Sequence, residues 1–477
     1  MEQFDCVLIH HSGPGPNAKH IAPNVSMGVF ALADILQRNG YRTEIIHLGI
    51  EEYLDNSFSL ARYLRVKKPL LVGVTLHWHL QCSKTVGLVR SIKKIVPGVK
   101  VILGGYTASF FADQIMPEVK EVDFIIRGDA EKPLLELMRQ LKDGHFDLSS
   151  VPNLTWRRAK KVIHNKQSYV AKKEDLDQLN FSNFKLMKNS QFYLGSLAKI
   201  YQSVQDTETY NLLKLNPFYL SVGRGCRFNC LFCGGSAMAQ KLINNRNNLV
   251  FRSSKKVIST IKDAFREGVD TFCICFDPNL DKSYYFDLFQ SIRKNRIKIS
   301  MMFDCWSLPS FEFIDAFAKT FQDGKHSSLA LSPETGSERL RKKYKGSFHT
   351  NQEYFEVFRY LRAKGIKCVV QFGYIFPGES MVDFKKTSDF IETTNEIFKG
   401  RVLVIINKCV IDPASLFYMF PKKYKITRKA VSFSDYCRLD PWKSYSFFPA
   451  QQKKMKAVLK MWQKVEALQL LDIADPI

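Results

Sequence analysis

The hydrophobic positions of residues 1–145 follow two alternating spacings. Continuous apolar runs typical of buried parallel strands, such as residues 69–76, alternate with stretches such as 26–41 that carry apolar residues at helical spacing. This pattern predicts five strands joined by helices, and therefore a doubly wound parallel sheet. Ligands of such sheets bind at the carboxyl ends of the strands.

The alternation resumes over residues 216–412, with six strand patterns and five helical patterns between them. It predicts three quarters of a βα barrel, a partial (β/α)6 arrangement whose working face is the carboxyl end of its strands. Residues 146–215 are predicted to be a linker that contains one hairpin turning near Ala159 and Lys160. The aromatic and basic residues 413–477 are predicted to form a small C-terminal capping region with a helix at 451–471. The predicted fold class is therefore α/β with two parallel sheets.

Composition and charge limit the partners of the chain. No apolar run reaches the roughly 18 residues that a membrane span needs, and the first residues lack the pattern of a secretory signal, so we expect a cytoplasmic protein without a membrane span. Seventy Lys and Arg against 46 Asp and Glu leave a net charge of +24. Such a balance favours an anionic partner, for example RNA or a phosphorylated small molecule, although a solvated basic surface has the same composition.

Three of the 11 cysteines lie together, as Cys226, Cys230 and Cys233. Three closely spaced thiolates can bind three irons of a [4Fe–4S] cluster and leave the fourth iron open. A zinc site would need a further Cys or His nearby, and none lies between residues 165 and 272 outside the triplet. The other cysteines are scattered: Cys6, Cys82, Cys273, Cys275, Cys305, Cys368, Cys409 and Cys437.

The CxxxCxxC spacing, in the loop after the first barrel strand, resembles that of the radical S-adenosylmethionine (radical SAM) superfamily. The resemblance implies that SAM chelates the open iron and is cleaved to a 5′-deoxyadenosyl radical. It extends over the whole barrel through segments that contact SAM in the family, although Pro278 and Pro333 depart from the family pattern. The SAM-binding residues that it implies are Phe232, Asp277, Ser332, Glu334 and Ile375.

The N-terminal domain resembles the Rossmann-like cobalamin-binding domain found in one group of these enzymes. The matching stretches are 73–81, 101–109 and 122–137, of which the last departs from the family's GEGE pattern at two positions. A nicotinamide site is less favoured, because no GxGxxG follows the first strand. The cobalamin-binding residues that the resemblance implies are Thr75, His77, Trp78, Gly104, Gly105, Thr107, Gly128 and Glu131.

The environment of the cobalt's lower face is open to three interpretations. The DxHxxG motif that supplies a histidine to cobalt in many cobalamin proteins is absent. Trp78 could cover the lower face and disfavour a ligand there, or it could pack in the domain interface. Either His77 or His79 could instead bind the cobalt.

The resemblance implies a cobalamin-dependent radical SAM methyltransferase, which methylates an unactivated carbon through the 5′-deoxyadenosyl radical and methylcobalamin. The alternatives are a radical SAM cyclase, rearrangement enzyme or epimerase, the last with Cys305 or Cys409 as hydrogen donor. An RNA methylthiotransferase would carry a second cysteine triplet in its N-terminal domain, and a non-enzymatic cobalamin sensor would not need the SAM segments. The expected partners are an anionic small molecule or peptide as substrate and an external one-electron donor such as flavodoxin or ferredoxin. Nucleic acid is a further alternative as a partner.

Overall fold

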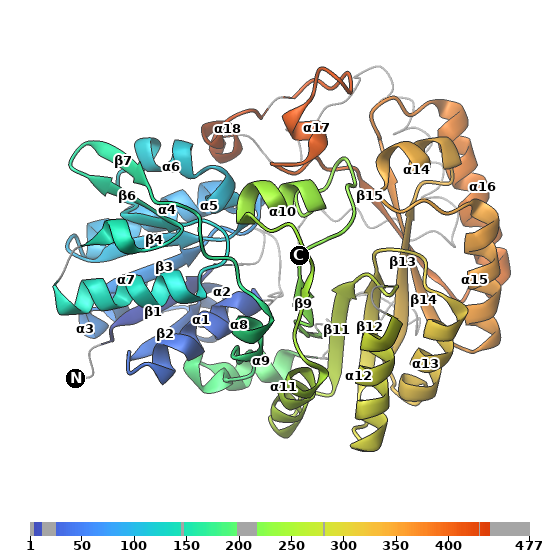
Figure 1. The fold of residues 1–477 in the computed structure, drawn as a ribbon, viewed down its shortest axis with the longest axis horizontal. Helices are drawn as coiled ribbons and strands as arrows, with labels where there is room; N and C mark the ends of the chain where they lie inside the picture. Colours follow the sequence, from blue (N-terminus) through green and yellow to red (C-terminus); the bar gives the residue numbers. More distant parts are fainter. Residues whose placement is uncertain are drawn as a thin grey trace.

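Two sheets lie side by side in the molecule, the first in blue and turquoise and the second in green to orange (Figure 1). The predicted helix at 451–471 lies outside the described residues. The computed structural model describes residues 4–11, 25–144, 147–197, 217–279, 282–428 and 430–438.

The first sheet has seven strands in the order β2-β1-β3-β4-β5-β6-β7. Its first five strands are parallel, which confirms the predicted doubly wound sheet. The predicted hairpin forms β6 and β7 and turns at Ala159, whose φ of 52° is left-handed. The hairpin pairs with β5, so the sheet extends into the segment expected to be a linker. The strands are β1 (Cys6–His10), β2 (Thr43–His47), β3 (Leu71–Thr75), β4 (Lys100–Gly104), β5 (Phe124–Ile126), β6 (Leu154–Arg158) and β7 (Lys161–His164).

Helices cover both faces of this sheet. Helices α1 and α7 contact each other, as do α3 and α4. The connection from β1 to β2 runs one way across the sheet, and the connection from β3 to β4 runs the other way. The two helix pairs therefore lie on opposite faces of the sheet, and a topological switch point lies between β1 and β3. The helices are α1 (Met27–Arg38), α2 (Leu48–Leu54), α3 (Leu60–Lys67), α4 (Cys82–Ile95), α5 (Tyr106–Phe110), α6 (Ala112–Glu118) and α7 (Glu131–Asp143).

The segment that follows joins the two hydrophobic cores. The ring of Phe184 lies 5.6 Å from that of Phe30 on α1 and 5.6 Å from that of Phe218 in the barrel. This continuous aromatic packing buries the connection between the two sheets. The segment and the preceding loops contain α8 (Lys173–Asp177), α9 (Ser190–Ser196), and the 3₁₀ turns η1 (His79–Gln81), η2 (Leu148–Ser150) and η3 (Phe184–Leu186).

The second sheet confirms the predicted partial barrel, with six parallel strands in the order β15-β14-β13-β12-β11-β8. Its strands are β8 (Phe218–Tyr219), β11 (Thr271–Phe276), β12 (Ser300–Cys305), β13 (Ser328–Glu334), β14 (Lys367–Tyr374) and β15 (Leu403–Lys408). The helices between them are α11 (Ser254–Arg266), α12 (Lys282–Lys294), α13 (Phe311–Phe321), α14 (Glu338–Tyr344), α15 (Asn351–Ala363) and α16 (Met381–Phe398).

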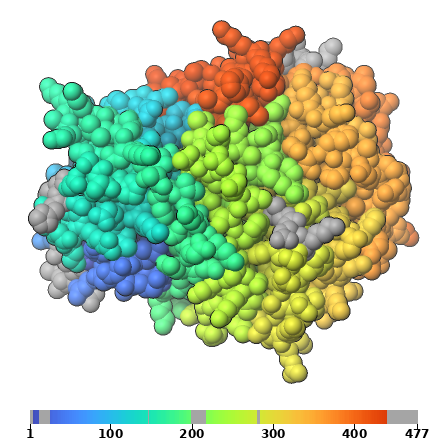
Figure 2. Space-filling view, in the orientation of Figure 1, coloured from blue at the N-terminus to red at the C-terminus, as the bar shows by residue number. Residues whose placement is uncertain are grey.

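Two further pieces of the chain connect the two halves of the molecule. The cysteine loop leaves and re-enters the barrel through a short antiparallel pair, β9 (Gly223–Arg224) and β10 (Val250–Phe251), and carries α10 (Ala237–Asn244). Helices α17 (Leu416–Met419) and α18 (Phe433–Arg438) lie across the top of both halves, and α18 contacts α4 and α6 (Figures 1 and 2). In the part of the chain that the structure describes, no helix combines the length and the apolar character of a membrane span.

Candidate functional site

The three clustered cysteines lie in the loop between β9 and α10, each partly buried. Backbone donors around a thiolate stabilise its charge and orient it toward a metal. Each sulfur accepts one backbone N–H group: that of Phe228 to Cys226 (3.4 Å), that of Gly346 to Cys230 (3.2 Å) and that of Gly235 to Cys233 (3.3 Å).

Burial raises the pKa of all three thiols, that of Cys226 to about 11. Iron binding must therefore remove protons that burial favours. The Lys345 ammonium opposes this shift at Cys230. It also lies 3.5 Å from the Glu334 carboxylate and donates a hydrogen bond to the Ser332 carbonyl, so two of the predicted SAM residues meet beside a cluster ligand.

A [4Fe–4S] cluster and a single metal ion require different arrangements of ligands. Among the described residues, no three His, Cys, Asp or Glu side chains converge on one metal ion. In a [4Fe–4S] cluster each thiolate binds a different iron, so the three sulfurs surround the cluster instead of converging. The cysteine loop, with its three backbone donors and the nearby ammonium, fits such a cluster.

Asp412 ties this loop to the N-terminal domain. Its carboxylate accepts the N–H of Gly234 at 2.9 Å and lies 3.9 Å from Nδ1 of His79. A side chain at Gly234 would bring Cβ within 2.7 Å of the Asp412 Cβ, so this approach requires glycine. Burial raises the pKa of Asp412 to about 6. The sequence did not reveal this contact, although an acidic residue just beyond the last barrel strand lies at the working edge.

The remaining predicted SAM residues lie near the same edge. The ring of Phe232 lies 5.9 Å from that of Phe376. Ile375 has a φ of 63°, an uncommon conformation for a β-branched residue that costs about 1–3 kcal/mol and is found mainly at functional positions. Asp277 forms an ion pair with Arg227, so its carboxylate holds the cysteine loop.

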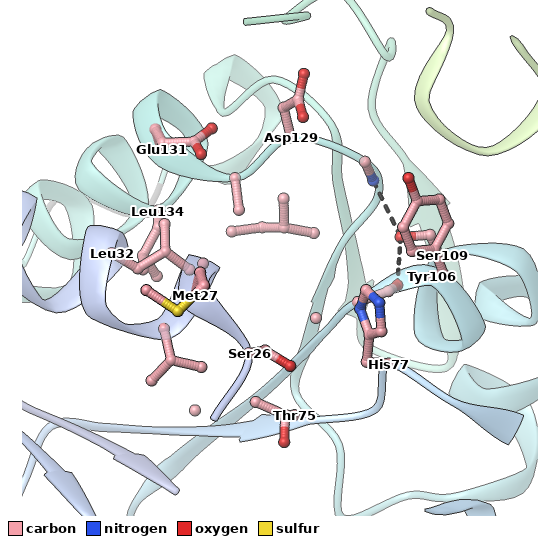
Figure 3. A pocket seen from close by; sticks show the side chains of 18 of the residues that line it. Ser26, Met27, Leu32, Thr75, His77, Tyr106, Ser109, Asp129, Glu131 and Leu134 are labelled. Atoms are coloured by element: carbon pink, nitrogen blue, oxygen red, sulfur yellow. Dashed lines mark hydrogen bonds between the residues drawn. The ribbon is translucent and has the colours of Figure 1, made fainter. Parts of the chain in front are cut away.

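A cavity of about 350 Å³ lies at the carboxyl ends of β1, β3 and β4, at the switch point (Figure 3). Met27, Leu32 and Leu134 form an apolar wall, and Asp129 lies at the polar rim. Six of the eight predicted cobalamin residues line the cavity: Thr75, His77, Gly104, Gly105, Gly128 and Glu131.

The loop after β3 is held rigidly at the mouth of this cavity. Gly105 has a φ of 112°, and a Cβ there would lie 2.8 Å from the Cα of His77. The hydroxyl of Thr107 donates to the His77 carbonyl at 2.9 Å, so it supports the loop and does not line the cavity. The His77 ring makes edge contacts with the rings of Trp78 and Tyr106, and burial lowers its pKa to about 4, which keeps it neutral at pH 7. Trp78 is 54% exposed, so it is not buried between the described parts of the two domains.

Four charged side chains form the polar rim of the cavity and join the two domains. Arg224 contacts Asp129 at 2.8 Å and also pairs with Glu131, while Arg246 pairs with Asp129. Among the described residues, one oxygen of Glu131 and the Nε of Arg246 are buried without a hydrogen-bond partner, but neither atom is accessible from the cavity. The charged groups of the rim and the apolar wall of the cavity match the amide-bearing edge and the apolar body of cobalamin, so the cavity fits this cofactor. The sequence reasoning missed both arginines.

The two candidate hydrogen-donor cysteines lie in different surroundings. Cys305 lies on the same face of β12 as Phe303, whose ring is 5.1 Å from that of Tyr285 on α12, so it faces the helices. Cys409 directly follows β15, and its N–H donates to the Tyr374 carbonyl, so its role as hydrogen donor stays a prediction.

Comparison with known proteins agrees with both halves of this site. The family model of the radical SAM superfamily matches residues 220–391, and that of the B12 binding domain matches residues 22–138. An uncharacterised methyltransferase of Pyrococcus horikoshii is 22% identical over 377 residues, which are 76% of this chain and 72% of that protein. An anaerobic magnesium-protoporphyrin IX monomethyl ester cyclase of Synechocystis is 22% identical over 213 residues, 44% of this chain and 37% of that protein.

The fold has a solved counterpart. The radical S-adenosylmethionine methyltransferase TsrM from Kitasatospora setae superposes with a TM-score of 0.68 at 15% identity, over 96% of this chain and 88% of that one. At this identity the likeness shows the fold, with the B12-binding sheet before the barrel. The chain belongs to the radical SAM superfamily, in the group with a B12-binding domain, and is an enzyme whose cofactors are a [4Fe–4S] cluster, SAM and cobalamin.

Proposed function

We propose that this enzyme is a methyltransferase that methylates an unactivated carbon of its substrate. The observation that carries the proposal is the shared wall of the two cofactor sites: Arg224, two residues before Cys226, lines the corrin cavity. When bound, the cluster and SAM supply the 5′-deoxyadenosyl radical, and cobalamin carries the methyl group. A methyltransferase among the similar proteins supports this choice.

The residues of the chain bind and orient these groups. The three thiolates hold the cluster, and the Lys345 ammonium lies beside Cys230 as a fixed positive charge. Phe232, Asp277, Ser332, Glu334 and Ile375 form the SAM subsite in this proposal. The loop around His77 and the apolar wall hold the corrin and its nucleotide tail. Residues 1–145 would act as the cobalamin domain and 216–412 as the radical SAM barrel, joined by 146–215 and capped by 413–477.

The first test is cofactor content. The full chain, expressed with cobalamin and reconstituted anaerobically, is desalted and analysed for iron, sulfide and cobalt. We expect four irons per chain from the [4Fe–4S] cluster and one cobalt per chain from cobalamin. Cys230→Ser should lose iron, whereas Cys437→Ser, which changes a partly buried thiol on α18, should retain it. Iron that stays bound in the Cys230 variant would refute the cluster site.

The second test concerns methyl transfer. The loaded enzyme is incubated with a reductant, SAM and candidate anionic substrates, and both SAM products are quantified. Formation of 5′-deoxyadenosine together with S-adenosylhomocysteine would support methyl transfer. Formation of 5′-deoxyadenosine alone would refute it and favour a ring-forming or rearrangement reaction, the second candidate, which the likeness to a cyclase supports.

A further inference from the structure

Two thiols on strand β11 face the interior of the barrel. The sulfurs of Cys273 and Cys275 lie 3.7 Å apart, within hydrogen-bond range for sulfur. Alternate residues of a strand point to opposite faces. Phe272, Ile274 and Phe276 belong to the core between the sheet and its helices, so the two cysteines between them face inward.

The strand register supports the inward placement. Cys275 pairs with Asp304, which pairs with Ala330, then Val369 and Leu403 on the following strands. Ala330, Val369 and Leu403 belong to an apolar cluster that is separate from the outer core. The row of residues that contains Cys275 therefore crosses the barrel interior.

A chain of polar groups leads from this pair toward the cluster site. The electrostatic neighbours of Asp304 include Lys345 and Glu334, and Lys345 lies beside Cys230. Burial raises the pKa of Asp304 to about 6. The hydrogen bond with Cys273, together with burial, raises the pKa of Cys275 well above its usual value, so its sulfur carries a proton at pH 7.

We propose that Cys275, supported by Cys273, donates a hydrogen atom to carbon radicals formed inside the barrel. An S–H bond is weaker than the C–H bond that replaces it, so the transfer is downhill. The proposal rests on the radical chemistry of the proposed function and adds a second fate for a radical, reduction by hydrogen in place of methylation. A substrate carbon could thereby be inverted or reduced.

The step balances as follows. The S–H bond of Cys275 breaks, a C–H bond forms, and the unpaired electron remains on the Cys275 sulfur. The proton of Cys273, whose sulfur is 3.7 Å from that of Cys275, moves by way of the Cys275 sulfur to Asp304, the carboxylate that neighbours Cys275, and the two sulfurs then share the unpaired electron. One electron from the donor that reduces the cluster, a ferredoxin or flavodoxin, together with the proton on Asp304 and one proton from water, restores both thiols.

The test needs no knowledge of the substrate. The holoenzyme is incubated with SAM and dithionite in D₂O, where thiols exchange to S–D, and 5′-deoxyadenosine is analysed by mass spectrometry. Without substrate, the 5′-deoxyadenosyl radical takes its hydrogen from the nearest weak bond. We expect a single solvent deuterium in the product, and its loss to the background level in Cys275→Ser.

Matched variants separate this role from a structural one. Cys305→Ser and Cys368→Ser change thiols in the outer core and should keep the deuterium. In Cys273→Ser, the first equivalent of 5′-deoxyadenosine should carry deuterium, and the labelled fraction should decrease in later turnovers. Iron content is measured for every variant, so that loss of the cluster is recognised.

The outcomes distinguish the two proposals. Unlabelled 5′-deoxyadenosine from the unmodified enzyme, or labelling that persists in Cys275→Ser, overturns the hydrogen-donor role and leaves methyl transfer intact. An absence of any 5′-deoxyadenosine overturns both. Labelling that depends on Cys275 and not on Cys305 or Cys368 supports the assignment.

Discussion

Replacing Arg224 with methionine tests whether charge holds the two domains together. The Arg224 guanidinium meets the carboxylates of Asp129 and Glu131, and the three side chains are 22%, 7% and 6% exposed. Methionine keeps much of the apolar stem of arginine, so the main loss is the charge. Two buried carboxylates then lose their shared partner.

The expected loss in the free energy of unfolding follows from the burial of the ion pair. Removing one member of a buried ion pair costs about 3–5 kcal/mol, because the remaining charge stays buried. Arg246 still pairs with Asp129, which offsets part of the loss. We therefore expect Arg224→Met to lower the free energy of unfolding by about 3 kcal/mol, a factor of roughly 150 in the folded-to-unfolded ratio.

The assay is urea unfolding of the cofactor-free chain, followed by tryptophan fluorescence. Trp156 on β6 is a buried reporter in the first sheet. Arg266→Met is the matched control, because Arg266 pairs with Asp263 at 2.9 Å but is 72% exposed. Exposed pairs contribute about 0–1 kcal/mol. If Arg224→Met costs no more than Arg266→Met, the interdomain network does not stabilise the protein.

Three further predictions concern single positions. Gly105→Ala should weaken cobalamin binding about 10-fold or more, a shift of about 1.4 kcal/mol, because Cβ would displace the loop after β3. Gly87→Ala is the control, because Gly87 lies on α4 outside the cavity and its Cβ would meet no atom within 4 Å; absorbance titration measures both variants. Lys345→Met should make the midpoint potential of the cluster more negative, because it removes a positive charge beside a ligand, whereas Lys345→Arg should retain the value in an EPR redox titration. Burial raises the pKa of Asp383, but hydrogen bonds from Arg339 and serine hydroxyls outweigh it and hold the pKa well below its usual value. The carboxylate therefore stabilises the fold above about pH 4, so Asp383→Asn should be destabilised at pH 7 and approach the unmodified protein as the pH falls below about 4 in unfolding experiments.

The parts of the site that the sequence predicted are those with a local signal. Apolar runs gave the strands of both sheets, and the strand order of a doubly wound sheet places its ligand at the switch point. That is why six residues chosen from short motifs line one cavity. The cysteine triplet likewise needs only its spacing.

Contacts between distant segments gave no such signal. Arg224 lies 95 positions from Asp129, Arg246 lies 117 positions from it, and Asp412 lies 178 positions from Gly234. No periodicity or spacing relates residues so far apart. Each was visible only once the barrel loop had been placed against the first sheet.

The choice of cysteine shows a second kind of limit. Both faces of β12 carry an apolar residue, Met302 on one and Phe303 on the other, so the apolar pattern does not say which side Cys305 faces. Register decides, because a shift of one residue exchanges the two faces. Cys305 was chosen for its position at a strand end, and the structure places it in the outer core. Cys275 lies on the inner face of the neighbouring strand.

The cysteine loop fixes the two cofactor sites relative to each other. It is closed at its base by the pairing of β9 with β10, and Arg224 and Arg246 lie near that base. Both arginines pair with Asp129 on the rim of the corrin cavity, while Asp412 holds the loop through Gly234 on the other side. Separating the domains would expose or orphan these buried charges, at a cost of several kcal/mol. In the proposed function, substrate therefore reaches a site whose distance from both cofactors is already set, which is the preorganisation that radical transfer between fixed positions requires.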